Sequence, residues 1–218
     1  MPPANDSDDM PRAPSEIIWT ADECTIDALS RLVGEPVLTI LCSSLRTHLT
    51  PGRPPRLRTE QVAIPVSGGL VTVGFPDWGD TEHFAINAFR IEARYRETAP
   101  EWAQQQYSEK KGGPIFPWTG ISFRAPEFYK SPALAPIERV RVYRQEREER
   151  NADRGFTERV RFDKAILFER EEEETFLLFV DDSSIAGLMG ISSDPDEIRR
   201  VWDGCTVSTE IGERRAEG

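Results

Sequence analysis

Residues 138–170 read ERVRVYRQEREERNADRGFTERVRFDKAILFER, and two runs within this stretch decide the fold class. In residues 138–145 and again in residues 158–170, apolar side chains alternate with charged ones, which is the period of a strand with one dry and one wet face. Between the two runs, arginines and acidic residues interleave without an apolar pattern. We therefore predict two strands joined by a salt-bridged polar loop, and not a basic arm that binds nucleic acid.

Short runs with strand character recur along the rest of the chain, separated by turn residues. They are residues 36–45, 62–66, 70–75, 84–95, 175–182, 186–192 and 206–211. Ser67, Gly68 and Gly69 form a strong hairpin signal between the second and third of these runs. Many short strands with tight turns predict an α+β fold, with a predominantly antiparallel sheet of about seven to nine strands and about three helices on one face or at its ends.

Three helix starts carry capping signals. The expected caps are Thr20, Thr98 and Asp194, each followed three residues later by a glutamate, and Pro195 stands at the first position of the third helix. Glycines that can end these helices stand at positions 34, 112 and 204.

At 218 residues the chain suits one large domain or two small ones. We predict a single α+β domain over residues 16–211, in which two lobes would meet near residues 112–136. Residues 1–15, acidic and proline-rich, and residues 212–218 are expected to be disordered tails. No apolar run is long enough to span a membrane and the N-terminus does not resemble a secretory signal, so a cytoplasmic location is expected.

The three cysteines, Cys24, Cys42 and Cys205, are far apart and form no CxxC pair. This spacing fits neither a disulfide framework nor a zinc site, so we expect small buried apolar residues.

Residues 75–84, FPDWGDTEHF, hold the densest group of chemically capable side chains: Asp77, Asp80, Glu82 and His83. A hard cation needs six or more oxygens in a defined spacing, and zinc would want more than one histidine nearby, whereas the only other histidine is His48, in a separate loop. The stretch is therefore predicted to be a solvated turn. Its four side chains are kept as weak metal candidates, with a catalytic acid or base role as a further alternative.

Residues 112–136 fit neither strand nor helix periodicity and are rich in proline and aromatic residues. They form either a loop that packs on the sheet or a binding surface for a partner or ligand. For the second alternative the candidate contacts are Trp118, Phe128 and Tyr129.

The net charge of −11 is unevenly distributed. Residues 158–218 carry 16 acidic and 8 basic residues, a balance of −8, so nucleic acid and anionic lipid are poor partners and a basic protein is a better one. The candidate contacts are the consecutive Glu171, Glu172, Glu173 and Glu174, with Asp181 and Asp182 beyond the next strand. They would act as an electrostatic attractant, although a solvated loop is the alternative.

The chain contains none of the common phosphate-binding, nucleophile-elbow or metalloprotease motifs. We therefore predict no catalytic residue and no cofactor. The leading hypothesis is a non-catalytic cytoplasmic protein-binding module, in the manner of the acidic inhibitor or immunity proteins of bacteria. The alternatives are a small enzyme or ligand-binding domain, with its pocket between the sheet and residues 112–136, and a structural subunit of a larger assembly.

Overall fold

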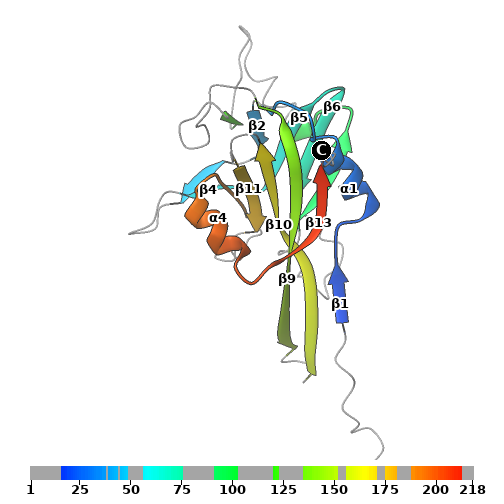
Figure 1. Cartoon of the computed structure of the whole chain (residues 1–218), viewed down its shortest axis with the longest axis vertical. Helices are drawn as coiled ribbons and strands as arrows, with labels where there is room; N and C mark the ends of the chain where they lie inside the picture. The colour runs from blue at the N-terminus through cyan, green and yellow to red at the C-terminus, as the bar shows by residue number, and fades with distance from the viewer. Residues whose placement is uncertain are drawn as a thin grey trace, which may run out of the picture.

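A computed structural model describes residues 16–37, 39–43, 45–48, 56–75, 91–102, 120–122, 135–151, 156–170, 175–180 and 188–212. Within these ranges the chain forms an eight-stranded and a five-stranded sheet with two complete helices, so the fold is of the α+β type (Figure 1). The strands exceed the predicted seven to nine, and they form two sheets instead of one.

The larger sheet has the order β13-β9-β10-β11-β12-β4-β3, and β1 adds to β10 outside this path. Every pairing in it is antiparallel except β1 with β10. Its strands are β1 (Glu16–Trp19), β3 (Arg46–His48), β4 (Arg56–Thr59), β9 (Ile137–Asn151), β10 (Phe156–Arg170), β11 (Thr175–Val180), β12 (Met189–Ser192) and β13 (Thr206–Gly212).

The smaller sheet is antiparallel and has the order β7-β6-β5-β2-β8. Its strands are β2 (Thr39–Cys42), β5 (Gln61–Val66), β6 (Gly69–Gly74), β7 (Glu92–Arg96) and β8 (Gly120–Ser122). The predicted hairpin at Ser67–Gly69 joins β5 to β6, and Gly68 takes a positive φ of 85° there. The predicted strand at 36–45 is confirmed over Thr39–Cys42, between β5 and β8.

The main core lies between the two sheets. Val140, Val142, Ile166 and Phe168 point into it from β9 and β10, and the smaller sheet contributes alternate residues such as Val62 and Val71. A second, smaller core lies on the other face of the large sheet, under the helix α4 (Pro195–Trp202). Its buried members are Tyr143, Ala165, Leu167, Leu177, Phe179 and Ile198. Because the large sheet is covered on both faces under α4, the sequences of β10 and β11 are nearly continuously apolar in this region.

The first helix, α1 (Glu23–Ser30), begins at a different cap from the predicted Thr20. The cap is Asp22, whose Oδ1 accepts a hydrogen bond of 2.7 Å from the backbone N–H of Thr25. Both residue types cap helices, and Asp22 has the additional partner Arg94 across on β7. Gly34, at a φ of +85°, ends the turn that follows α1 and donates its N–H to the Ile137 carbonyl.

The prediction for α4 is confirmed at both ends. Asp194 is the cap, Pro195 is the first helical residue and Gly204 follows the helix with a φ of 75°. Of the second predicted helix, residues 98–102 lie in the described part of the chain; 101 and 102 are helical, and 98–100 precede the helix.

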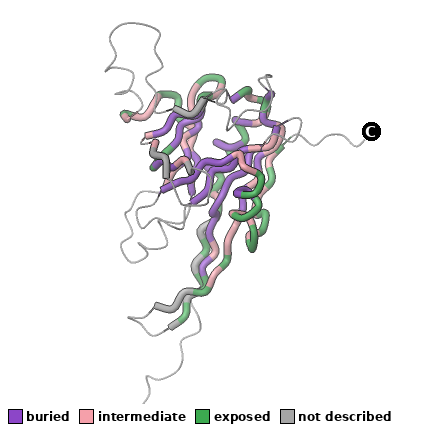
Figure 2. Tube along the Cα trace, turned by 90° about the vertical axis from the view of Figure 1, so that its left-hand side faces the viewer, coloured by how far each residue is buried: buried purple, intermediate pink, exposed green. Residues whose placement is uncertain are grey.

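The polar loop predicted between the two long strands is wrong, because β9 and β10 continue through it as an arm. The two strands pair without interruption from Asp163–Arg144 to Phe156–Asn151, and the arm extends away from the body (Figures 1 and 2). Cross-strand ion pairs, such as Arg161 to Glu146 at 2.9 Å, stabilise this part of the ladder. Charged residues replace the alternation of apolar and polar residues in this part of the sequence. The pattern that predicts a strand is therefore absent, which is why a loop was predicted.

The cysteine prediction holds in part. Cys42 is buried in the main core, and Cys205 packs partly buried against the second core. Cys24 is exposed, because it lies on the outer side of α1.

Candidate functional site

The site residues predicted from the sequence lie outside the described part of the chain, and their roles stay predictions. They are Asp77, Asp80, Glu82, His83, Trp118, Phe128, Tyr129, Glu171, Glu172, Glu173, Glu174, Asp181 and Asp182. Among the described residues, no group of histidine, cysteine and carboxylate side chains could hold a metal ion.

The strand end that precedes the glutamate run carries a compact cluster of two arginines and two glutamates. Arg141 forms ion pairs of 3.0 Å with Glu169 and 2.9 Å with Glu210. Arg139 lies 3.8 Å and 3.7 Å from the same two carboxylates. The three strands β13, β9 and β10 are thereby linked by charge across one open face. Glu169, which the sequence places with the acidic run, is therefore already paired with two cations.

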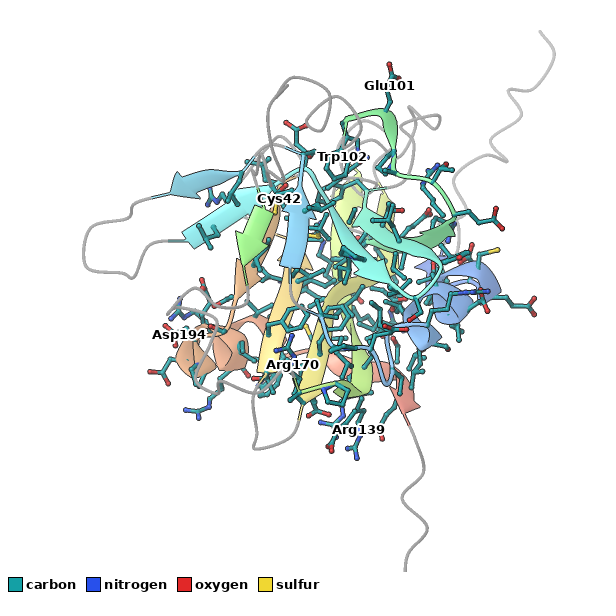
Figure 3. The ribbon with its side chains drawn as sticks, turned by 90° about the horizontal axis from the view of Figure 1, so that it is seen from above. Cys42, Glu101, Trp102, Arg139, Arg170 and Asp194 are labelled. Atoms are coloured by element: carbon teal, nitrogen blue, oxygen red, sulfur yellow. The ribbon has the colours of Figure 1, made fainter. Side chains whose placement is uncertain are left out.

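Arg170, the last residue of β10, is a second anchor at this end (Figure 3). It is only 5% exposed, and its Nη2 donates a 2.9 Å hydrogen bond to the carbonyl of Val37. Its guanidinium lies 5.6 Å from the centre of the Phe176 ring, which in turn stacks on Phe168 at 4.4 Å. The end of β10 that precedes the glutamate run in the sequence is therefore held by charge, hydrogen bonding and packing.

The acidic candidates fall at two ends of one strand. Glu174 directly precedes β11 and Asp181 directly follows it, and a six-residue strand spans about 20 Å. The start of α4 belongs to the first of these ends, because Ser192 pairs with Leu177 near the beginning of β11. Asp194 and Asp196, both at that helix start, therefore lie on the side of the sheet where β11 begins.

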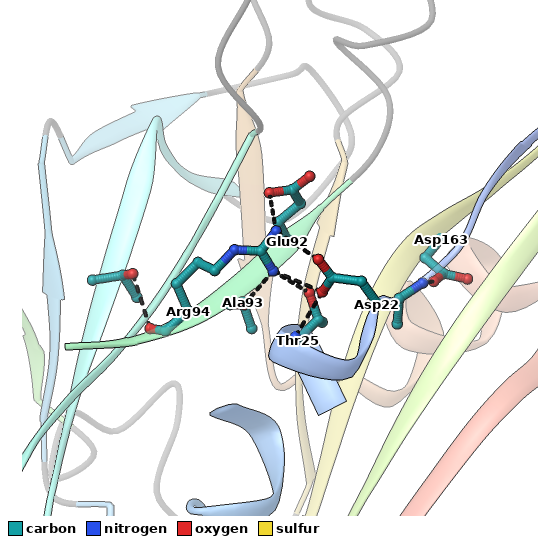
Figure 4. A network of polar contacts seen from close by, with 8 residues as sticks. Asp22, Thr25, Glu92, Ala93, Arg94 and Asp163 are labelled. Carbon is teal, nitrogen blue, oxygen red and sulfur yellow. Dashed lines mark hydrogen bonds and ion pairs between the residues drawn. The ribbon is translucent and has the colours of Figure 1, made fainter. Parts of the chain in front are cut away.

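A polar network joins the start of α1 to β7 (Figure 4). The guanidinium of Arg94 donates to both oxygens of Asp22 at 2.8 and 2.9 Å, to Glu92 at 2.9 Å and to the Thr25 hydroxyl at 2.7 Å. Burial acts to raise the pKa of Asp22, but the hydrogen bonds from Thr25 and Arg94 outweigh it and hold the pKa below its usual value. The network lines a cavity of about 260 Å³.

Next to this network, Asp163 is buried at the point where the arm leaves the body. Its carboxylate accepts hydrogen bonds from the Ala21 N–H and, at 3.0 Å, from the Ser208 hydroxyl, and it lies 3.5 Å from Nε of Arg144. Burial raises its pKa, although these donors act in the opposite direction. Sequence reasoning missed Asp163. The available signal was that the FDKAILF run loses its alternation at this residue, where the structure has a β-bulge.

A second cavity, of about 340 Å³, lies along the outer side of α4. It is lined by Asp196, Arg199, Arg200, Trp202 and Asp203, with Arg199 and Asp196 paired at 3.6 Å. The residues that line the two cavities are mainly charged or polar, whereas small-molecule sites are usually lined by apolar and aromatic side chains.

No protein-family model fits the chain, and no curated protein or solved structure is significantly similar to it. None of the helices in the described ranges is long and apolar enough to cross a membrane.

Proposed function

We propose that this chain is a non-catalytic protein-binding module that recognises a more basic protein through the acidic end of its β10–β11 hairpin, residues 169–175. The observation that carries the proposal is the anchoring of that end. Glu169 is ion-paired with Arg139 and Arg141, and Arg170 is buried against Val37 and Phe176. A binding segment whose two ends are fixed loses less conformational freedom when a partner binds.

The charge balance at the hairpin end supports a basic partner. Among the described residues, Arg139 and Arg141 are paired with Glu169 and Glu210, and the four glutamates that follow add four negative charges to this end of the sequence. Consecutive carboxylates attract cationic surfaces over a distance and speed association, an effect that falls as salt rises. A cytoplasmic inhibitor of the immunity type, which neutralises a basic enzyme or toxin, fits this mode of binding.

The alternative of a small enzyme or ligand-binding domain has less support. Its pocket would lie against residues 112–136, of which the structure describes only β8 and the last two residues. The two cavities described above lie elsewhere, at the start of α1 and along α4, and charged or polar residues make up most of their lining.

The test is capture of the partner from the source cell by the tagged full-length chain, at low and high salt, with identification by mass spectrometry. The proposal expects a basic protein in stoichiometric amounts at low salt and less of it at high salt. Association rates are then measured with the purified partner. Reversal of Glu171, Glu172, Glu173 and Glu174 to lysine should slow association at least about tenfold at low salt.

The matched control makes the same change in net charge within the terminal segments, by reversing Asp6, Asp8, Asp9 and Glu217 to lysine. This control should associate much faster than the hairpin variant. If both variants slow equally, net charge and not the hairpin end steers the partner, and the proposed surface is wrong. If the tagged chain captures no protein at either salt concentration, the proposal as a whole is contradicted.

A further inference from the structure

The N-terminal strand β1 is attached to the protein by a single strand pairing. It runs parallel to β10, with Glu16–Trp19 opposite Arg159–Phe162, and pairs with no other strand of the described residues. Glu16 adds one ion pair, at 2.9 Å from Arg161, and Ile18 is 53% exposed. Parallel pairing is slightly weaker per residue than antiparallel pairing. Four residues joined in this way form the least anchored strand on the arm.

The groups that β1 contacts have other partners, which lowers the cost of displacing it. Arg161 also pairs with Glu146 at 2.9 Å. Asp163, which binds the Ala21 N–H just after β1, keeps the Ser208 hydroxyl and the nearby Arg144. Loss of β1 would therefore leave neither charge without a partner, and a buried charge without a partner is the costly outcome.

β1 also covers only part of the β10 edge on its side. Among the described residues, the pairing begins at Glu16 opposite Arg159, whereas β10 starts three residues earlier, at Phe156. A longer strand could pair along more of the edge.

We propose that the β10 edge over Phe156–Phe162, here called the acceptor edge, is a binding site for an extended strand of a partner protein, and that β1 occupies it as a replaceable internal strand. The partner segment would carry a carboxylate within reach of Arg161 and apolar side chains opposite Val160 and Phe162, which are both fully buried. Strand addition supplies affinity through the backbone and specificity through these side chains. The proposal does not depend on the acidic end of the hairpin, and its test leaves Glu171–Glu174 unchanged.

The test uses the full-length chain and a labelled peptide of its own residues 13–20, APSEIIWT, with binding followed by fluorescence anisotropy. One variant carries Glu16→Cys and Arg159→Cys, which are directly opposite in the ladder and leave Arg161 for the peptide's carboxylate, in a Cys24→Ser background. When oxidised, this variant holds β1 in place. The peptide should then bind at least about tenfold more weakly than to the same protein after reduction, because the open fraction limits the apparent affinity.

A second variant opens the edge instead. Glu16→Arg places a cation against Arg161 and should tighten binding of the peptide about threefold or more, since the fraction with β1 displaced rises. The matched control, Asp203→Arg, makes the same charge change at the exposed end of α4 and should leave the affinity unchanged.

Equal peptide affinities in the oxidised and reduced forms would overturn the proposal, as would equal affinities for Glu16→Arg and Asp203→Arg. Self-association of the wild-type chain that the oxidised variant lacks, measured by light scattering without peptide, would mean that a second copy's residues 16–19 fill the edge; it would overturn the assignment to a different protein. Circular dichroism shows whether each variant is folded, and the oxidised and reduced comparison within one protein does not depend on a change in stability.

Discussion

Phe179 of β11 lies directly over Gly190 of β12, its cross-strand partner in the second core. A Cβ atom at position 190 would come within 2.3 Å of Cζ of the ring, which is far inside any real contact. The absence of a side chain at Gly190 is therefore what allows the ring to pack where α4 covers the sheet.

This relationship predicts that Gly190→Ala lowers the free energy of unfolding by about 1–3 kcal/mol, the usual cost of overfilling a core. Urea unfolding is the measurement. Gly74→Ala is the matched control, because there the added Cβ meets the flexible Gln61 side chain at 2.9 Å and should cost less. Phe179→Leu in the Gly190→Ala background should recover part of the loss. Equal costs for the two glycine variants would contradict this account.

Asp163 is predicted to make the fold more stable as the pH falls. Burial raises its pKa in the folded state above the value of 3.8 expected for an exposed aspartate. The folded protein therefore binds the proton more tightly than the unfolded chain does, and this contribution is lost as the pH rises through the folded pKa. Asp163→Asn keeps an acceptor for the Ala21 N–H but has no group that titrates. When the pH is lowered from 7 to 4, the unfolding free energy of the wild type should therefore increase relative to that of the variant. If the difference in unfolding free energy does not change with pH, burial does not raise the pKa of the Asp163 carboxyl group.

Asp22 should behave in the opposite way. Its pKa is lowered in the folded state, because hydrogen bonds from Thr25 and Arg94 outweigh the effect of burial. Its stabilising contribution is present above the unfolded pKa and is lost as the pH falls through the folded pKa. Asp22→Asn, which still caps α1, should therefore lose its disadvantage relative to wild type in acid.

The capping role of Asp22 makes a separate prediction, checked by thermal unfolding at pH 7. Asp22→Ala should lower the unfolding free energy by about 0.5–2 kcal/mol, the range for loss of an N-cap. Asp22→Asn should cost less than Asp22→Ala, because its side-chain oxygen can still accept from Thr25. If the two substitutions cost the same, the ion pair to Arg94 and not the cap is what stabilises this end of α1.

Arg170 is predicted to be needed for the stability of the hairpin end. Arg170→Met keeps much of the apolar stem but removes the donor to Val37, so a buried carbonyl loses its partner at a cost of about 1–3 kcal/mol. Arg170→Lys restores a charge without the planar guanidinium over Phe176 and should fall between wild type and Arg170→Met. Chemical denaturation followed by near-UV circular dichroism measures both. A stable Arg170→Met would mean that the hairpin end is held by Glu169 and packing alone.

Local sequence rules predicted the features that depend on nearest neighbours. The cap and stop of α4, the hairpin turn at Ser67–Gly69 and the strand character of β9 and β10 follow from residue types a few positions apart. These rules failed at α1, where the choice of Asp22 over Thr20 is accompanied by Arg94, a residue 72 positions away. They also failed at the tip of the arm, where cross-strand charge pairs replace apolar alternation.

The sequence by itself therefore determined the α+β class, the caps of α4 and the uneven charge, because propensity, periodicity and composition are local quantities. Only the tertiary structure decided the division into two sheets, the parallel pairing of β1 with β10 and the ion pairs of Glu169 with Arg139 and Arg141. The physical reason is that strand order and ion pairing are set by contacts between residues far apart in the chain. Dozens of arginine–carboxylate combinations are possible in this composition, and the packing of the two sheets selects among them.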